Sequence, residues 1–180
     1  NNNSVLINYE FRNKEKGWNF QNIVYEFKNG KRKRIIPWND PFFHGFSINA
    51  FLRPACYECP FANPKRVSDF TIADCWRVAS SHPQYDDNKG TTLILVNTKK
   101  AQAIWQEIYS TGQIYGGEYD FDLAQMRNSA LMNPAFKTNY VDLFDRIFKE
   151  SSSFVTAAKS YLSWKKTLKY TIAYFVKKVG

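Results

Sequence analysis

The sequence lacks a long apolar run and an export signal, and both absences narrow the class of protein. No stretch of about 18 consecutive apolar residues occurs, so no segment is apolar enough to cross a bilayer as a helix. The first residues, Asn1 to Ser4, are polar and lack the basic-then-apolar order of a secretory signal. We therefore expect a cytoplasmic protein, at most peripheral on the inner face of the membrane. Since residue 1 is not Met, we also expect a processed chain or a piece of a longer one.

Disorder and low complexity are excluded by composition. The 180 residues are 44% hydrophobic and 23% charged, which is close to the average for globular domains. The aromatic content of 17% is the unusual feature, and 25 basic against 16 acidic residues leave a net charge of +9. This length suits one domain, or one domain with a short appendage.

An antiparallel hairpin is predicted in the first third of the chain. Apolar and polar residues alternate over residues 5–11, the pattern of a half-buried strand. Asn29 and Gly30 predict a type I′ turn between a strand in residues 18–27 and a returning strand over residues 31–36. Four basic residues open the returning strand, and we interpret them as protection of a sheet edge rather than as a binding site.

Helices dominate the later part of the predicted fold. An apolar run over residues 91–97 is typical of a strand buried on both faces. The other expected elements are a short helix within residues 42–52, a strand over 70–73, a loop over 80–90, a helix over 101–109 and helices from 122 onward, with breaks near 134 and 151–153. The fold class is therefore mixed α+β, with residues 1–150 as one domain and residues 151–180 as a basic helical tail.

The cysteines leave three interpretations open. Cys56 and Cys59 are separated by two residues, so both sulfurs can reach one metal ion or one face of an iron–sulfur cluster. Together with Cys75 and His44 they could instead form a closed zinc site. They could also be buried apolar residues or a redox dithiol. Spacing alone does not choose among a cluster, zinc and no metal.

A set of spaced motifs resembles a known family. The motifs are Phe11 to Trp18, the segment Arg53-Pro54-Ala55-Cys56-Tyr57-Glu58-Cys59, the run Arg66 to Trp76 that contains Ser68-Asp69 and Asp74, and Lys89-Gly90 before the apolar run. Over about residues 5–110 the sequence resembles the C-terminal domain of the coenzyme F420 hydrogenase/dehydrogenase beta-subunit family.

The resemblance implies an electron-transfer flavoprotein with a 4Fe–4S cluster and FAD. It implies Cys56 and Cys59 as cluster ligands, with the remaining ligands in an N-terminal ferredoxin-like domain or another redox subunit. The isolated chain would then be inactive. Residues that would meet the flavin or its phosphates are Arg53, Arg66, Asp69, Thr71, Asp74, Lys89 and Thr91, although capping or bracing of loops explains the two acids equally well.

Departures from the family pattern favour an alternative. Ala73 and Arg77 stand where the family has glycine, and Cys75 stands where an aromatic residue is common. A backbone that approaches a cofactor closely often needs glycine. The alternative is a cofactor-less binding or scaffold domain, and analogy suggests cell-envelope polysaccharide biosynthesis at the membrane surface.

The C-terminal segment is basic and amphipathic. Six lysines and no acidic residue follow Glu150, and apolar residues recur at steps of three and four from Tyr161 to Val179. A helix over 159–179 could lie on an anionic membrane surface. Packing against its own domain or a partner explains the pattern equally well, and nucleic-acid binding is a weaker option because no recognition motif accompanies the lysines.

Overall fold

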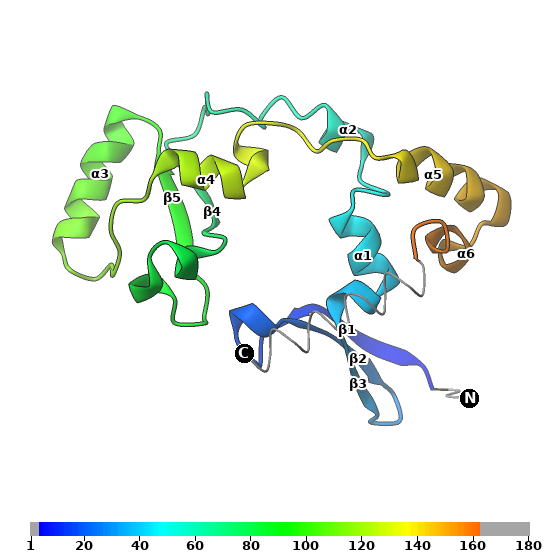
Figure 1. Cartoon of the computed structure of the whole chain (residues 1–180). Coiled ribbons are helices and arrows are strands. Elements are labelled where there is room, and N and C mark those ends of the chain that lie inside the picture. The colour runs from blue at the N-terminus through cyan, green and yellow to red at the C-terminus, as the bar shows by residue number, and fades with distance from the viewer. Residues whose placement is uncertain (1–3, 163–180) are drawn as a thin grey trace. The chain divides into compact units, whose positions relative to one another are not determined.

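The computed structural model describes residues 4–162, which fold into two compact units (Figure 1). The first unit comprises the chain up to Tyr57 together with the chain from Phe136 onward, and the second spans Glu58–Ala135. Antiparallel strands come early and helices late, which confirms the predicted α+β class. Within residues 4–162 no helix is long and apolar enough to cross a membrane. The expected division at residue 150 stays a prediction, since residues 163–180 lie outside the described part.

The first unit combines a three-stranded sheet with short helices. Its sheet has the order β1-β2-β3 and is antiparallel throughout. The elements are β1 (Leu6–Asn13), β2 (Asn22–Phe27), β3 (Arg32–Ile35), α1 (Pro41–Ser47), α2 (Pro54–Tyr57), α5 (Asn139–Ser151) and α6 (Phe154–Ala158), with single 3-10 turns at Trp18–Phe20 and Pro37–Asn39. The central strand β2 carries the buried residues Ile23 and Val24. The alternating burial expected for β1 is wrong for its first half, because Leu6 and Ile7 are both exposed on this edge strand.

The β2–β3 turn differs from the predicted type. A type I′ turn needs positive φ at both central residues, but in this turn only Gly30 has it, at 79°. The Gly30 N–H donates to the Phe27 carbonyl at 2.8 Å, and the Phe27 N–H donates to the Lys31 carbonyl at 2.9 Å. This is the three-residue hairpin in which a type I turn is followed by a left-handed glycine. The glycine is a correct signal for the turn, and the loop is one residue longer than predicted.

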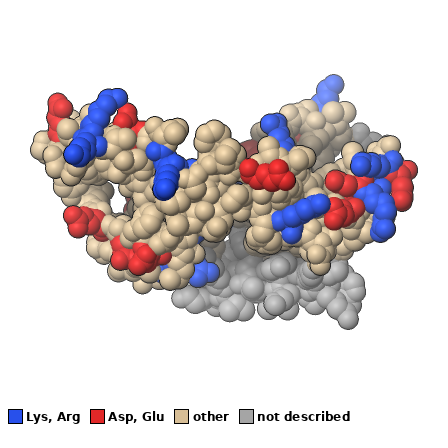
Figure 2. Space-filling view, turned by 90° about the horizontal axis from the view of Figure 1, so that it is seen from above, with Lys and Arg blue, Asp and Glu red and all other residues tan. Residues whose placement is uncertain are grey.

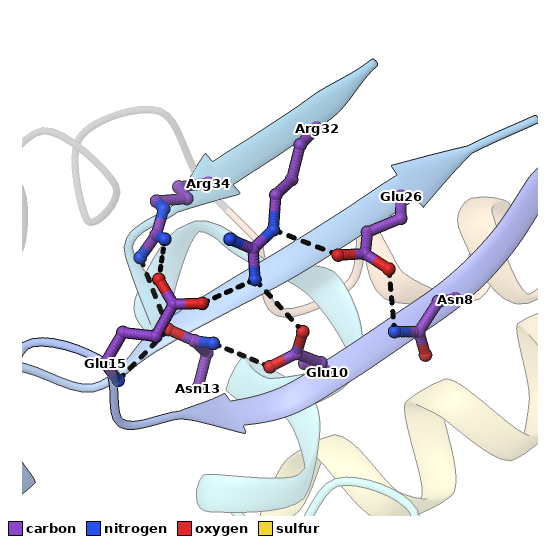
Figure 3. A network of polar contacts seen from close by, with 7 residues as sticks. All are labelled: Asn8, Glu10, Asn13, Glu15, Glu26, Arg32 and Arg34. Carbon is purple, nitrogen blue, oxygen red and sulfur yellow. Dashed lines mark hydrogen bonds and ion pairs between the residues drawn. The ribbon is translucent and has the colours of Figure 1, made fainter. Parts of the chain in front are cut away.

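Two of the basic residues at the start of β3 belong to an ion network on one face of the sheet (Figure 3). Arg32 contacts Glu10, Glu15 and Glu26 at 3.2, 2.7 and 3.0 Å. Arg34 pairs with Glu15 and also donates to Asn13 at 3.3 Å. The Asn13 amide, followed by the Arg32 guanidinium, holds the pKa of Glu10 below its ordinary value. Because these arginines are engaged by acids of the same unit, they stabilise the sheet rather than form an open basic patch.

A buried carboxylate joins the sheet to helix α1. Asp40 is 2% exposed and caps α1, accepting from the Phe43 N–H at 2.6 Å. The same carboxylate accepts from the hydroxyl of Tyr9 on β1 at 3.0 Å and from that of Tyr25 on β2. Proline at the first helical position, Pro41, fits the start of a helix because its missing N–H would have no partner there.

This cluster makes the first unit sensitive to alkaline pH. Burial, reinforced by the nearby Asp40 carboxylate, raises the pKa of both Tyr9 and Tyr25 well above the ordinary value of about 10. Above that pH the folded state binds more protons than the unfolded state, so stability falls as pH rises. We expect the slope of unfolding free energy against pH, measured by urea denaturation from neutral to strongly alkaline pH, to be shallower in Tyr9→Phe. Parallel slopes would contradict this.

The main core of the first unit is aromatic and reaches the start of the C-terminal segment. Ala50, Phe144, Ala157 and Tyr161 are buried together, with Phe51, Phe154 and other residues packed against them. The Tyr161 hydroxyl donates to the Pro41 carbonyl at 2.8 Å. Tyr161 therefore belongs to the core, although the sequence pattern makes it the first residue of an amphipathic face. Of the helix predicted over 159–179, residues 159–162 follow the end of α6 at Ala158 and are not helical, and the remainder lies outside the described residues.

The second unit is built on a two-stranded antiparallel sheet. Strand β4 (Phe70–Asp74) pairs with β5 (Thr92–Val96), followed by α3 (Lys99–Ser110) and α4 (Phe121–Arg127). Thr98 and Asp120 cap the two helices, accepting from the N–H groups of Ala101 and Leu123 at 3.1 and 2.8 Å. The core consists of Cys75, Val78, Leu93, Ala124 and Leu131. Single 3-10 turns lie at Val78–Ser80, Pro83–Tyr85 and Ser129–Leu131.

The expectation that residues 91–97 are buried on both faces is wrong. Only Leu93 is buried, at 5% exposure, while Val96 is 37% exposed. Within the described residues β5 pairs with β4 alone, so this apolar strand lies at a sheet edge. The apolar run identifies a strand correctly, but its burial depends on neighbours that this part of the chain does not supply.

Candidate functional site

The three cysteines lie in two kinds of environment. Cys56 is in the one-turn helix α2, where its N–H donates to the Arg53 carbonyl at 2.8 Å, and Cys59 follows with a turn in which Ala62 donates to its carbonyl at 3.2 Å. Both are free thiols of intermediate burial. Cys75 is buried in the core of the second unit. Burial raises the pKa of the Cys75 thiol, which disfavours the thiolate that a metal would need.

The structure does not support a zinc site made from Cys56, Cys59, Cys75 and His44. His44 is 1% exposed, and its Nδ1 lies 3.1 Å from the Trp38 carbonyl, which can only accept a hydrogen bond. The ring packs edge-on against Trp38 and beside Tyr161. Nowhere in residues 4–162 do three or more His, Cys, Asp or Glu side chains gather in a way that could hold a metal ion. Cys56 and Cys59 alone would be fewer than the four thiolates that a cluster normally takes, and their assignment as cluster ligands stays a prediction.

Two candidate cofactor residues lie at one end of the β4–β5 sheet. The Asp69 carboxylate accepts from Thr98 Oγ1 at 2.6 Å and from Lys100 Nζ at 2.8 Å. The Lys100 ammonium and the Thr98 hydroxyl hold the pKa of Asp69 below its ordinary value. Thr71 Oγ1 accepts from Asn97 Nδ2 at 3.0 Å. These contacts brace the end of the sheet against the start of α3.

Three further candidates lie toward the other end. Asp74 ends β4 opposite Thr92, about 17 Å along the strand from Asp69 at the usual rise per residue. Thr91 Oγ1 donates to the Tyr85 carbonyl at 2.6 Å. Lys89 is exposed and lies 3.7 Å from an Asp87 carboxylate oxygen. The Thr91 hydroxyl and the Lys89 ammonium thus have partners within their own loop.

The remaining candidates are Arg66 and Arg53. Arg66 Nη2 donates to the main-chain carbonyls of Ala130 and Leu131 at 3.1 and 3.4 Å, which ties the loop before β4 to the turn after α4. Arg53 is exposed and belongs to the first unit. The seven residues are thus not brought together as one set that fits a flavin. Their assignment as cofactor ligands stays a prediction.

The backbone explains one departure from the family pattern. Arg77 adopts φ 58° and ψ 31°, the left-handed region that glycine occupies without strain. Its carbonyl accepts from Arg127 Nη1 at 2.7 Å, which holds this turn against α4. A glycine at this position would thus have a conformational reason, and the arginine adopts the left-handed backbone at some cost.

A wide cleft lies within the second unit. It has a volume of about 1440 Å³ and runs along β5, between α3 and residues 113–119. The rings of Tyr85, Trp105, Tyr109 and Tyr115 line it. Only three charged residues contribute to its walls, Asp87, Lys99 and Glu118. With one base and two acids, the cleft is poorly suited to a pyrophosphate, although the whole chain is basic.

On the face drawn in Figure 2, acidic and basic side chains are interspersed rather than separated by sign.

Neither this cleft nor the Asp40 cluster is evident from the sequence. Gly116 and Gly117 predict only a break after a helix. Gly117 passes so close to the Tyr85 ring that a Cβ would lie 3.3 Å from its Cζ and still nearer to its hydroxyl. The high aromatic content is the one available signal, but it does not say which rings remain outside the core.

Comparison with protein families gives one match. A family model for the C terminus of the coenzyme F420 hydrogenase/dehydrogenase beta subunit matches residues 4–120, more than half of the chain. No curated protein and no solved structure gives a match.

Proposed function

The chain belongs to the coenzyme F420 hydrogenase/dehydrogenase beta-subunit family, C-terminal part, and from this premise we propose a role in iron–sulfur electron transfer. Cys56 and Cys59 supply two thiolates to a 4Fe–4S cluster, and residues outside this chain complete it. The observation that supports the proposal is a difference in burial among three free thiols: Cys56 and Cys59 are partly exposed, whereas Cys75 is buried in a core.

The chemistry divides between the chain and its partner. A bound cluster would pass single electrons between a donor and an acceptor. This chain contributes the Cys-x-x-Cys turn, in which a two-residue spacing lets both sulfurs face the same inorganic centre. The remaining ligands come from a ferredoxin-like domain or another redox subunit, so the isolated chain is inactive. We assign the flavin to the full protein, since three of the seven residues expected to hold it, Arg66, Asp69 and Thr91, already have hydrogen-bond partners within the second unit.

Iron analysis of cysteine variants tests the proposal. The full-length protein is purified without oxygen, and iron, acid-labile sulfide and the electron paramagnetic resonance spectrum of the reduced protein are measured. We expect Cys56→Ser and Cys59→Ser each to lose most of the iron and the cluster signal, because each removes a ligand. Cys75→Ala is the matched control and should retain both, since Cys75 lies in a core. Equal iron in all variants would refute the role of the pair.

A second function is favoured by the internal engagement of the candidate residues. Arg66, Asp69 and Thr91 all have hydrogen-bond partners within the second unit. This is the arrangement expected of a domain that has kept the fold as a binding or scaffold module without a cofactor. A full-length protein without iron, sulfide and flavin after anaerobic purification would favour this function. A place in cell-envelope polysaccharide biosynthesis at a membrane surface rests on analogy and stays a prediction.

A further inference from the structure

Among residues 4–162, no strand pairs with one edge of β5, and the hydrogen bonds to β4 show which main-chain groups lie on that edge. The Cys75 N–H donates to the Thr91 carbonyl and the Asn97 N–H donates to the Asp69 carbonyl, both at 2.9 Å. In an antiparallel pair, residues alternate between bonding to the partner strand and pointing away from it. Given the observed register, Leu93 and Leu95 therefore bond to β4. The N–H and C=O groups of Thr92, Ile94 and Val96 point to the other side.

That edge opens onto the cleft of the second unit. Every residue from Gly90 to Lys99 contributes to the cleft wall. Trp105 and Tyr109 lie on α3, where their rings stack with centroids 5.9 Å apart. Tyr85 and Tyr115, whose rings meet edge-on at 5.4 Å, also line the cleft. The unpaired main-chain groups of β5 thus face a space walled by aromatic rings.

The side chains of β5 include neither a charge nor a proline, two of the usual protections of an edge strand against pairing. Its sequence is Thr92-Leu93-Ile94-Leu95-Val96. By contrast, the edge strand β3 begins with arginine and lysine residues, two of which join an ion network. An apolar run of this kind is typical of a strand that is covered on both faces of its sheet. The second unit supplies a neighbour on one side only.

We propose that an extended segment of a partner polypeptide adds to β5 as a third strand within this cleft. Main-chain hydrogen bonds to Thr92, Ile94 and Val96 would hold it, as in other cases of strand addition. Apolar side chains of the segment would pack against the aromatic walls. This proposal does not depend on the cluster at Cys56 and Cys59.

The walls of the cleft limit the size of the segment that can bind, and its charged residues limit the charges that the segment can carry. Helix α3 and residues 113–119 flank the edge, so a single strand fits where the sheet of a second folded copy would meet the walls. Asp87 precedes β5 and Lys99 follows it, so opposite charges stand at the two ends of the edge. Asp87 also contacts Lys89, an exposed pair that water screens. The segment therefore carries a basic residue near Thr92 and an acidic residue near Val96.

Hydrogen exchange on the full chain tests strand addition. The probe is a synthetic nine-residue peptide selected for binding from a randomised phage-displayed library. When the peptide saturates the protein, we expect amide exchange at Thr92, Ile94 and Val96 to slow about tenfold or more. Leu93 and Leu95 already bond to β4 and should change little. Protection without this alternation, protection elsewhere, or a library that yields no binder would overturn the proposal.

Proline variants of the two strands provide a matched pair. Ile94→Pro removes an N–H that points into the cleft, and Ile72→Pro makes the same change on the outer edge of β4, since residues 72 and 94 face each other in the register. We expect Ile94→Pro to weaken peptide binding about tenfold or more, and Ile72→Pro to leave it within about twofold. Equal effects would overturn the proposal. Circular dichroism checks that each proline variant is folded. If a variant does not fold, the amide-exchange pattern of the unsubstituted chain tests the proposal instead.

Discussion

Replacement of Asp40 by alanine is expected to lower the free energy of unfolding of the first unit by about 3–5 kcal/mol, the sum of three lost hydrogen bonds to a charged acceptor. The carboxylate accepts hydrogen bonds from Tyr9, Tyr25 and the Phe43 N–H, and it is 2% exposed. The substitution removes all three bonds and leaves two partly buried hydroxyls without their acceptor. Because the acceptor joins two strands of the sheet to the start of α1, the loss affects the sheet and the helix together. Urea denaturation followed by far-ultraviolet circular dichroism measures the change.

A second helix cap in the same unit provides the control for this prediction. Ser153 caps α6 by accepting from the Thr156 N–H at 3.3 Å, and this bond is solvent-exposed. Ser153→Ala loses only a cap, so we expect a loss of about 0.5–1 kcal/mol. Asp40→Asn keeps an acceptor oxygen and should lie between the two. If Asp40→Ala cost no more than Ser153→Ala, the carboxylate would be acting as a simple cap, and the two tyrosine contacts would contribute nothing.

The position of Asp40 explains what sequence patterns can and cannot reveal about the first unit. A strand, a turn with glycine and a short helix after proline are local features, and all three are predicted close to their observed bounds. The joining of Tyr9, Tyr25 and Asp40 is not local, since it brings together residues up to 31 positions apart. No periodicity encodes such a meeting.

In the second unit too, the sequence pattern predicts an element but not its surroundings. Residues 91–97 have the composition of a central strand, and a strand is present. Burial, however, is a property of the neighbours, and within the described residues β5 has a neighbour on one side only. Likewise, the motifs around Arg66, Asp69 and Thr91 identify the family correctly. Their observed partners are main-chain carbonyls, a helix cap and a lysine, which the motifs alone do not distinguish from cofactor ligands.

Replacement of Gly45 by alanine is expected to destabilise the first unit by about 2–3 kcal/mol. Gly45 is buried in α1, where an added Cβ would lie 2.5 Å from Tyr161 Oη, 2.7 Å from Tyr161 Cζ and still closer to the Phe51 ring. Alanine is the better helix former by about 1 kcal/mol, so propensity alone predicts the opposite sign. The clash prevails because both rings belong to a packed aromatic core, and their displacement would break the hydrogen bond from Tyr161 to Pro41.

The control for this prediction is a glycine with open space around it. At Gly116 in the second unit the nearest atom to an added Cβ is Ile114 Cγ2, at 3.9 Å. Gly116→Ala should therefore change stability by no more than about 0.5 kcal/mol. Thermal and urea unfolding of both variants, followed by tryptophan fluorescence and circular dichroism, measure the difference. If Gly45→Ala cost no more stability than Gly116→Ala, Tyr161 could not occupy its place against α1 in the core of the first unit.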